Sequence, residues 1–124
     1  MSPTPQPRLF VLPDRAAMGA AAARLVRTEI ERVVAARGRA RLVMACAPSQ
    51  DDYYAALVPL ARANPETWRR VEVFHMDDYV GLDASHPQSF RHYLRRHFLD
   101  HVEVAAFHPL RGEAPDADAE ARRY

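Results

Sequence analysis

The sequence predicts an α/β fold with a parallel β-sheet flanked by helices, and three features support this prediction. The contiguous apolar run Leu42–Ala45 is typical of a strand buried on both faces of a parallel sheet. A second apolar strand, 71–74, follows after an intervening helical pattern, as expected for alternating strands and helices. Soon after it comes the acid pair Asp77-Asp78, at the carboxyl end of a strand, where open α/β sheets bind their ligands.

Length and composition indicate one globular domain. The chain has 124 residues, of which 48% are hydrophobic and 27% are charged, which is enough for a core of its own. A net charge of +1 gives no reason to expect a nucleic acid or an anionic membrane as partner. No apolar run approaches the roughly 20 residues that span a bilayer. The single cysteine and the absence of a signal-peptide pattern lead us to expect a reducing, cytoplasmic location.

The N-terminal part of the chain predicts a strand followed by a packing helix. Residues 1–7 contain three prolines and no periodicity, so we expect a flexible lead-in. Leu9–Leu12 is predicted to be a short strand. Asp14 is placed to cap a long helix that Gly38 ends. The residues expected on or near the packing face of this helix are Met18, Ala22, Leu25, Ile30, Val33 and Arg37.

The next strand, Ala40–Cys46, leads into a loop of small and polar residues. Ser49 is a candidate N-cap for a helix predicted over 53–62, and Asp51 and Asp52 suit its first turn, where the helix dipole favours acids. The same loop could present backbone amides and the Ser49 hydroxyl to a phosphate, although it has no glycine. Cys46 has apolar neighbours and no basic residue near it in sequence, so we expect an inert buried thiol.

The acid pair has two interpretations. Adjacent residues at a strand end point in different directions, so one carboxylate can face a ligand while the other braces the loop. Apolar neighbours such as Phe74, Met76 and Tyr79 could raise the proton affinity of such a carboxyl toward that of a general base. Alternatively, both acids cap the turn and face water. On these grounds Tyr79 is expected to pack rather than to take part in chemistry.

An amphipathic helix is predicted after this loop, with Ser89 as its N-cap. The expected apolar positions are Phe90, Tyr93, Leu94, His97, Phe98 and Val102. The opposite face carries Arg91, Arg95 and Arg96, which we expect to be solvated rather than bound to a phosphate. Trp68 is expected to pack over an edge of the core, and 116–124 to form a short helix.

Two histidine arrangements are candidate metal sites. His97 and His101 are four residues apart, but the acid of the H-E-x-x-H pattern and a third ligand are missing. His75, Asp77 and His86 form an equally weak candidate set. We therefore predict no metal and no cofactor.

Four motifs in the second half of the chain resemble those of one enzyme family. Residues 74–82 are F-H-M-D-D-Y-V-G-L, residues 86–90 are H-P-Q-S-F, residues 98–102 are F-L-D-H-V, and residues 110–116 are L-R-G-E-A-P-D. They resemble the patterns F-N-M-D-E-Y-V-G-L, H-P-x-S-Y, F-F-D-H-V and L-N-G-N-A-P-D of the glucosamine-6-phosphate deaminase/isomerase family. The resemblance is strong over residues 71–124 and collinear before them. The related 6-phosphogluconolactonases share the fold, but their pattern after the strand is nearer D-E-R.

The resemblance implies a Rossmann-like parallel sheet and a role for each candidate site residue. Asp77 matches the base that moves a proton between C1 and C2 of an open-chain sugar phosphate. Asp78 and Tyr79 match its neighbours and are expected to contact substrate. The family's sugar-phosphate loop, near P-T-G-G-T-P, aligns with A-C-A-P-S-Q at 45–50. Ala47, Ser49 and Gln50 are therefore expected to face the substrate, although both glycines of the family loop are replaced.

The resemblance covers only about the first half of the family fold, which we place at residues 8–124. The family's later G-x-G-x-D-G-H-I-A-F-N-E-P segment, which supplies the ring-opening histidine and acids, has no counterpart here. The cations that hold the phosphate are missing as well. Whether the lone chain is an enzyme is therefore open, and we expect little or no deaminase activity from it.

Two alternatives to a deaminase/isomerase function stay open. The first is a non-catalytic module that binds a sugar phosphate or assembles with itself or another chain through exposed apolar surface. The second is a hydrolase similar to 6-phosphogluconolactonase. In each case we expect a small sugar phosphate as ligand and a homo-oligomer as the assembled state.

Overall fold

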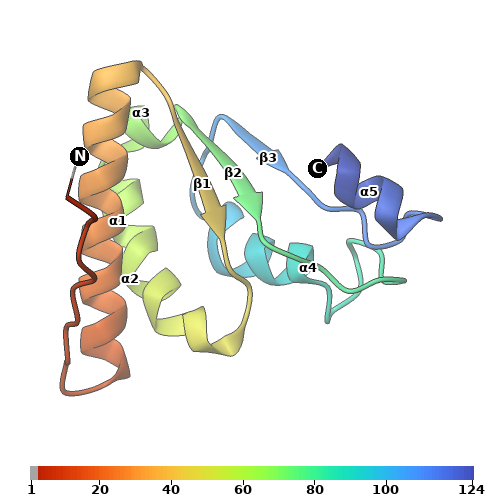
Figure 1. The fold of residues 1–124 in the computed structure, drawn as a ribbon, viewed down its shortest axis with the longest axis horizontal. Helices are drawn as coiled ribbons and strands as arrows, with labels where there is room; N and C mark the ends of the chain where they lie inside the picture. Colours follow the sequence, from red (N-terminus) through yellow and green to blue (C-terminus); the bar gives the residue numbers. More distant parts are fainter. Residues whose placement is uncertain (1–2) are drawn as a thin grey trace.

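A three-stranded parallel sheet organises the computed structural model, which describes residues 3–124 (Figure 1). The strands are β1 (Ala40–Met44), β2 (Val71–His75) and β3 (Ala106–His108), in the spatial order β1-β2-β3. Met44 pairs with His75, and Phe74 pairs with His108. The predicted α/β fold with a parallel sheet is confirmed. All three strands therefore end at the same edge of the sheet.

Helix α1 (Arg15–Arg37) begins and ends as the sequence predicted. The side chain of Asp14 accepts a hydrogen bond from the amide of Ala17 at 2.7 Å, which caps the first turn. Gly38 has a φ of 77°, and its amide donates to the carbonyl of Val34. Glycine adopts this left-handed conformation without strain, so it ends the helix.

The packing face of α1 differs from the expected one. Met18 and Leu25 are 54% and 62% exposed, whereas Gly19, Ala23 and Ile30 are buried. A Cβ atom on Gly19 would lie 2.7 Å from the backbone of Asp52 in the next helix. Because the two helices approach so closely, small residues rather than the largest apolar ones make the contact. The expectation for Met18 and Leu25 was therefore wrong.

Three short segments connect β1 to β2: the 3-10 turn η1 (Pro48–Gln50), helix α2 (Asp51–Arg62) and helix α3 (Pro65–Trp68). The prediction that Ser49 caps this helix was wrong, because the intervening turn makes Gln50 the residue before α2, without a side-chain cap. Asp51 and Asp52 lie in the first turn of α2 as expected. Trp68 is completely buried rather than at an edge of the core.

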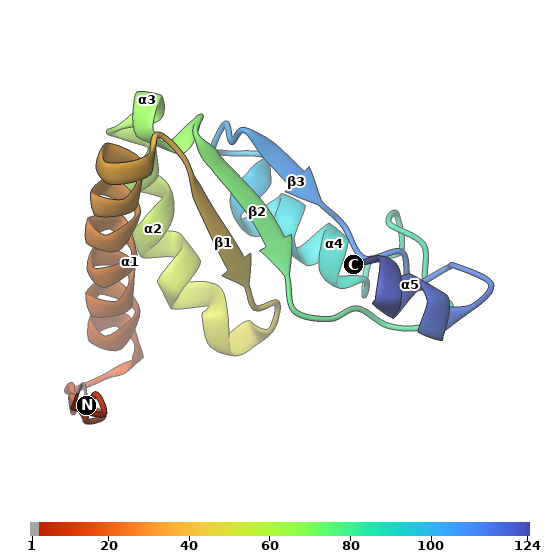
Figure 2. The ribbon, with the colours of Figure 1, turned by 45° about the horizontal axis from the view of Figure 1, so that its top comes forward.

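The region after β2 contains helix α4 (Phe90–Leu94), a π-helical turn η2 (Arg95–Leu99) and, after β3, helix α5 (Ala117–Arg123). The Ser89 side chain accepts from the amide of His92 at 3.0 Å, so the predicted cap of α4 is confirmed. Asp116 caps α5 by accepting from the amide of Ala119. Figures 1 and 2 show α2 and α4 on the same face of the sheet.

The core lies between that face of the sheet and the helices. Val71 and Val73 of β2 are fully buried there, and the rings of Trp68 and Phe98 meet at 5.6 Å with an edge-to-face tilt. The opposite face of the sheet is more open, and Val43 on β1 is 62% exposed. Among residues 3–124, no helix combines the length and apolar character needed to cross a membrane.

The strand predicted at Leu9–Leu12 does not form. This segment is extended but belongs to no sheet, and Leu9 and Val11 are 88% and 86% exposed. It runs beside α1, whose backbone is already hydrogen-bonded internally and offers no ladder for a strand. Of the expected lead-in 1–7, residues 1–2 lie outside the described residues, and 3–7 are exposed without helix or strand.

Gly19 provides a test of the close contact between α1 and α2. Gly19→Ala should lower the free energy of unfolding by about 1–2 kcal/mol, because overpacking against the α2 backbone outweighs the ~1 kcal/mol that alanine gains in helix propensity. Urea unfolding measures the change. Thr28→Ala, an exposed position of the same helix, is the control and should not destabilise. A stabilised Gly19→Ala variant would contradict the packing.

Candidate active site

The loops that follow β1 and β2 leave the sheet side by side. The amide of Met76 donates to the carbonyl of Met44 at 3.2 Å, which extends the strand pairing beyond the ends of both strands. The loop 45–50 and the loop 77–82 therefore start at the same edge, as Figure 1 shows. The structure thus brings together the two segments that sequence patterns assigned to the site.

Two tyrosine hydroxyls hold the first loop. The hydroxyl of Tyr54, a buried residue of α2, donates to the carbonyl of Ala45. The hydroxyl of Tyr93 in α4 lies 2.7 Å from the carbonyl of Ala47 and 2.6 Å from a carboxylate oxygen of Asp51. Tyrosine hydroxyls are protonated at neutral pH, and burial raises the pKa of both further, so both can donate. These contacts fix the loop without the glycines of the family motif.

Neither tyrosine was identified as a site residue from the sequence, because tyrosines in helices with apolar periodicity look like core residues. A second unrecognised group is Arg15, the first residue of α1. Its guanidinium donates to the carbonyl of Pro48 and to Asp52, at 2.8 Å each. Arg15 is thus a cation in contact with this loop. It lies 33 residues before Pro48 in the chain, so local sequence patterns do not reveal the contact.

Ser49 and Gln50 line a cavity of about 390 Å³ at this end of β1. Its wall is completed by α1 and by Met76, the residue before the acid pair. Ser49 is exposed, whereas Gln50 and Ala47 are half-buried. Ser49 and Gln50 are therefore next to a space that a small ligand can enter, whereas Ala47 and Asp77 are not among the residues that line it.

The two acids of the pair have opposite environments. Asp77 is exposed, and its carboxylate makes no hydrogen bond within residues 3–124. The Asp78 side chain is only 1% exposed. One of its oxygens accepts from the amides of Tyr79 and Phe90, and the other from Nε of Arg91, all at 2.8 Å. One acid thus faces outward while the other braces the loop.

This geometry changes the expected role of Asp78. A carboxylate that is buried and bound to several protein donors is not open to a substrate. We therefore revise its role from substrate contact to positioning of the loop. The interpretation that both acids face water does not hold, because Asp78 is buried.

Arg91 was expected on a solvated helix face, and that expectation was wrong. Its side chain is 3% exposed and pairs with Asp78. Arg95 and Arg96, by contrast, are exposed as expected. An arginine can be buried when its charge is paired and its donors are satisfied. The partner lies 13 residues away across a loop, where helical periodicity gives no information.

Tyr79 lies on the rim of the site and is 52% exposed. Its ring packs against Phe90 with 4.9 Å between the centroids. This agrees with the packing role expected from the residues alone, before the family resemblance. A Cβ atom on Gly112 would lie 2.1 Å from the Tyr79 carbonyl. The amide of Gly81, whose φ is 91°, donates to the carbonyl of Gly112. The loop after β3 therefore packs directly on the loop 77–82.

His75 and Cys46 lie just inside this edge of the sheet and are buried. Nε2 of His75 accepts from the amide of Leu110 at 2.8 Å, so the proton of the neutral ring is on Nδ1. Burial lowers the pKa of His75. Cys46 is buried as expected, and burial, together with the charges of Asp77 and Asp78, raises the pKa of its thiol to about 12.

No group of three or more histidine, cysteine or acidic side chains within residues 3–124 is arranged to hold a metal ion. His97 stacks on Tyr93 at 4.1 Å, and His101 bonds to the carbonyl of Arg96. The chemistry that the described site offers is that of an exposed carboxylate beside a fixed polar loop.

A parallel sheet with an exposed carboxylate at its carboxyl edge is the arrangement in which open α/β proteins place their ligand sites. The family described as glucosamine-6-phosphate isomerases/6-phosphogluconolactonase matches residues 13–124. The chain belongs to this family, as the motifs indicated.

Solved structures share the fold. A monomeric glucosamine-6-phosphate deaminase is 24% identical and aligns with 90% of this chain at a TM-score of 0.80. A 6-phosphogluconolactonase from Shewanella baltica is 20% identical over 90% of this chain, at a TM-score of 0.73. This chain covers 45% and 46% of those two chains, so it spans less than half of their length.

The buried neutral His75 predicts a pH dependence of stability. The pKa of His75 is lower in the folded protein than its unfolded value of ~6.5. Below pH ~6.5 the unfolded chain therefore binds a proton at His75 while the folded protein does not. The free energy of unfolding should fall as the pH drops from about 7 to about 5. His75→Gln, which keeps an acceptor for Leu110, should reduce this difference in urea unfolding. The exposed His101→Gln is the control. Equal pH dependence of wild type and His75→Gln would contradict the assignment.

Proposed function

We propose that the chain carries the proton-transfer base of an aminosugar-phosphate deaminase/isomerase, and that Asp77 is this base. The observation that supports it is the contrast within the acid pair. The Asp77 carboxylate is exposed and has no hydrogen-bond partner within the described residues, while Asp78 is buried and bound. A general base must reach the proton it removes, and of the two acids only Asp77 can do so.

The proposed step moves a proton between neighbouring carbons of an open-chain sugar phosphate. The Asp77 carboxylate takes the proton from one carbon of the C1–C2 unit and returns it to the other. The loop 45–50 would hold the ligand, with the Ser49 hydroxyl and the Gln50 amide as polar contacts and Ala47 as a backbone contact. Tyr79 would close one side of the site, and Arg15 is the adjacent cation.

This chain spans less than half of the length of the solved relatives. Ring opening and tight binding of the phosphate need groups beyond those described here, so the lone chain is expected to be weak or inactive and to bind a sugar phosphate only weakly. The sequence M-D-D-Y at 76–79 favours the deaminase over the lactonase alternative. We also propose a cytoplasmic location.

Asp77→Asn tests the base. If the chain releases ammonia from glucosamine 6-phosphate, the substitution should reduce the rate by about 10²-fold or more, the usual contribution of a general base. Asp100→Asn, an exposed acid on another segment, is the control. Similar activity in wild type and Asp77→Asn would exclude Asp77 as the base.

Hydrolysis of 6-phosphogluconolactone, measured in parallel, distinguishes the lactonase alternative from the deaminase. Hydrolysis of the lactone without ammonia release would favour the lactonase. If the chain releases no ammonia, calorimetry with fructose 6-phosphate asks whether the binding function is retained. Absence of both activity and binding would contradict the proposed function for this chain.

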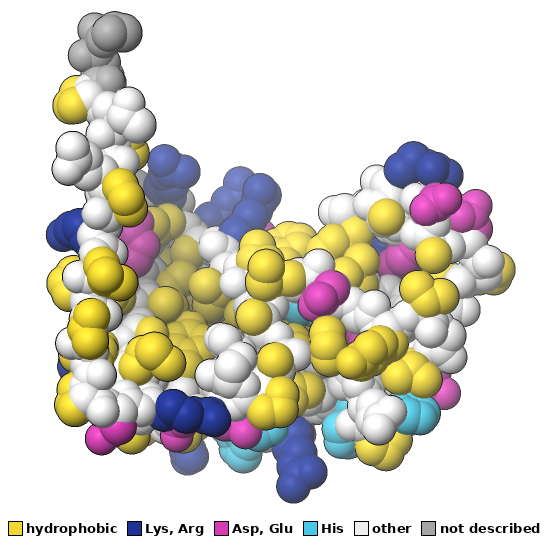
Figure 3. Space-filling view, turned by 60° about the horizontal axis from the view of Figure 1, so that its bottom comes forward, with side chains coloured by type: hydrophobic (Ala, Val, Ile, Leu, Met, Phe, Trp, Pro, Cys, Tyr) yellow, Lys and Arg dark blue, Asp and Glu magenta, His cyan; other side chains and the backbone are white. Residues whose placement is uncertain are grey.

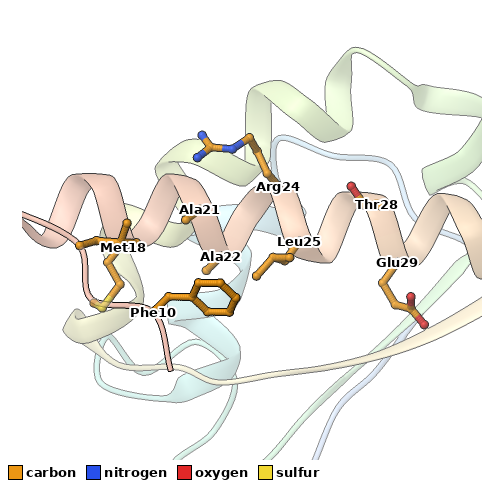
Figure 4. Close-up of a pocket in the computed structure, with 9 residues that line it drawn as sticks. Phe10, Met18, Ala21, Ala22, Arg24, Leu25, Thr28 and Glu29 are labelled. Carbon is orange, nitrogen blue, oxygen red and sulfur yellow. The ribbon is translucent and has the colours of Figure 1, made fainter. Parts of the chain in front are cut away.

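A second candidate function is self-assembly, supported by an exposed apolar surface. Phe10, Met18 and Leu25 line a groove of about 540 Å³ beside α1, where Figure 4 shows the Phe10 ring next to Leu25. Met18 also lines the neighbouring cavity with Val43 and Met76. Figure 3 shows hydrophobic side chains along the N-terminal segment and across the hollow beside it.

The exposed apolar side chains beside α1 suit a second copy of the chain. Phe10, Met18 and Leu25, which line the groove, are each more than half exposed. An exposed apolar groove of this kind is typical of a protein–protein contact. We therefore propose a homodimer through this surface.

Sedimentation of the chain tests the dimer. Wild type should sediment with twice the mass of one chain at about 100 μM, a concentration above the Kd expected for a standard interface. Leu25→Asp places a charge in the middle of the apolar surface and should give a monomer. Val80→Asp, an exposed site outside this surface, should stay dimeric. A wild type that is monomeric at this concentration would refute the self-assembly proposal.

A further inference from the structure

One buried guanidinium connects three segments around the acid pair. Nε of Arg91 donates to Asp78 at 2.8 Å, one terminal nitrogen to Glu113 at 2.8 Å, and the other to the carbonyl of Leu82 at 2.7 Å. The planar fork of arginine suits such simultaneous bonds, which a lysine ammonium cannot reproduce in the same geometry. Arg91 thus joins α4, the loop after β2 and the loop after β3.

The Asp78 carboxylate transmits this anchoring to the backbone. It accepts from the amide of Tyr79 in its own loop and from the amide of Phe90 at the start of α4. These bonds fix the peptide that follows Asp77. On the other side, the amide of Met76 is bonded to Met44 of β1. Asp77 is therefore the exposed residue between two fixed neighbours.

The loop after β3 also holds Arg91 and the loop 77–82 in place. Glu113, whose side chain is 44% exposed, pairs with Arg91, and the carbonyl of the preceding Gly112 accepts from the amide of Gly81. The loop 77–82 is thus bound at both ends by groups that depend on the position of Arg91. A freely moving loop would let the Asp77 carboxylate sample many directions.

We propose that Arg91 is the positioning residue of the site: acting through Asp78, it fixes the direction in which Asp77 presents its carboxylate to the ligand. Its importance for proton transfer rests on the proposed function of Asp77. The claim that Arg91 fixes the direction of the Asp77 carboxylate does not rest on that function, because the position and mobility of Asp77 can be measured without any reaction.

Two variants of the full chain test this role. Arg91→Lys keeps the charge but loses the fork, and Glu113→Gln weakens the network from its exposed side with little risk to folding. Arg69→Gln, which breaks exposed ion pairs with Glu66 and Glu103, controls for loss of an arginine. Ile30→Val, a buried change in α1, controls for a general loss of stability.

The first readout is NMR of the labelled chain. In both network variants, the side-chain carboxyl resonance of Asp77 should shift or broaden, and amide exchange over 79–82 should accelerate by about 10-fold. Both controls should leave these values unchanged. The proposal would be overturned if the Asp77 resonance and the exchange rates over 79–82 were unchanged in Glu113→Gln and in any folded Arg91→Lys. It would also be overturned if Ile30→Val changed these quantities as much as the network variants do. If Arg91→Lys does not fold, Glu113→Gln decides alone.

The second readout is the affinity for fructose 6-phosphate. If wild type binds it, Kd should rise by about 10-fold in the network variants and not in the controls, and an unchanged Kd would overturn the role in ligand presentation. If wild type binds no sugar phosphate, the proposed function fails. The NMR values then still decide whether Arg91 positions Asp77.

Discussion

The buried ion pair between Asp78 and Arg91 is the interaction on which the geometry of the candidate site depends. Both side chains are almost fully withdrawn from water, at 1% and 3% exposure. A buried charge is tolerated only when it is paired and hydrogen-bonded, and removing one partner of such a pair typically costs about 3–5 kcal/mol. Because the carboxylate also accepts two backbone amides, the pair determines the course of the loop as well as its own position.

The site combines two different ways of fixing a loop at one edge of a sheet. Parallel pairing of β1 and β2 starts both loops at the same place. The loop after β1 is held by neutral donors, the hydroxyls of Tyr54 and Tyr93, whereas the loop after β2 is held by a charged network. Asp77 is left exposed between them. This division explains why two adjacent acids in the sequence can have separate roles.

Local patterns predicted the elements of this fold well. Apolar runs identified β1 and β2, and the caps at Asp14, Gly38 and Ser89 form as expected, because each depends on residues within a few positions. The failures involve distant partners. Arg91 is buried by an acid across a loop, and Leu9–Leu12 lacks the neighbouring strand that its composition suits. The close approach of α2 at Gly19 turns Met18 and Leu25 away from the core.

The same limit applies to the candidate site. The position of the acid pair after a strand was sufficient to select the edge of the sheet, and the family motifs selected Asp77 within it. The contacts of Arg15, Tyr54 and Tyr93 with the loop after β1 depend on how helices pack, which spacing in the sequence does not show. The role of Asp78 likewise required its burial to be known.

The most direct test of the central claim is a titration of the labelled chain with fructose 6-phosphate, followed by the backbone resonances of the two loops. If Asp77 and the loop 45–50 form one ligand site, the amides of Asp77, Ala47, Ser49 and Gln50 should shift together with a single Kd, while those of α3 stay unchanged. Shifts confined to other segments, or no shifts at millimolar ligand, would contradict the account.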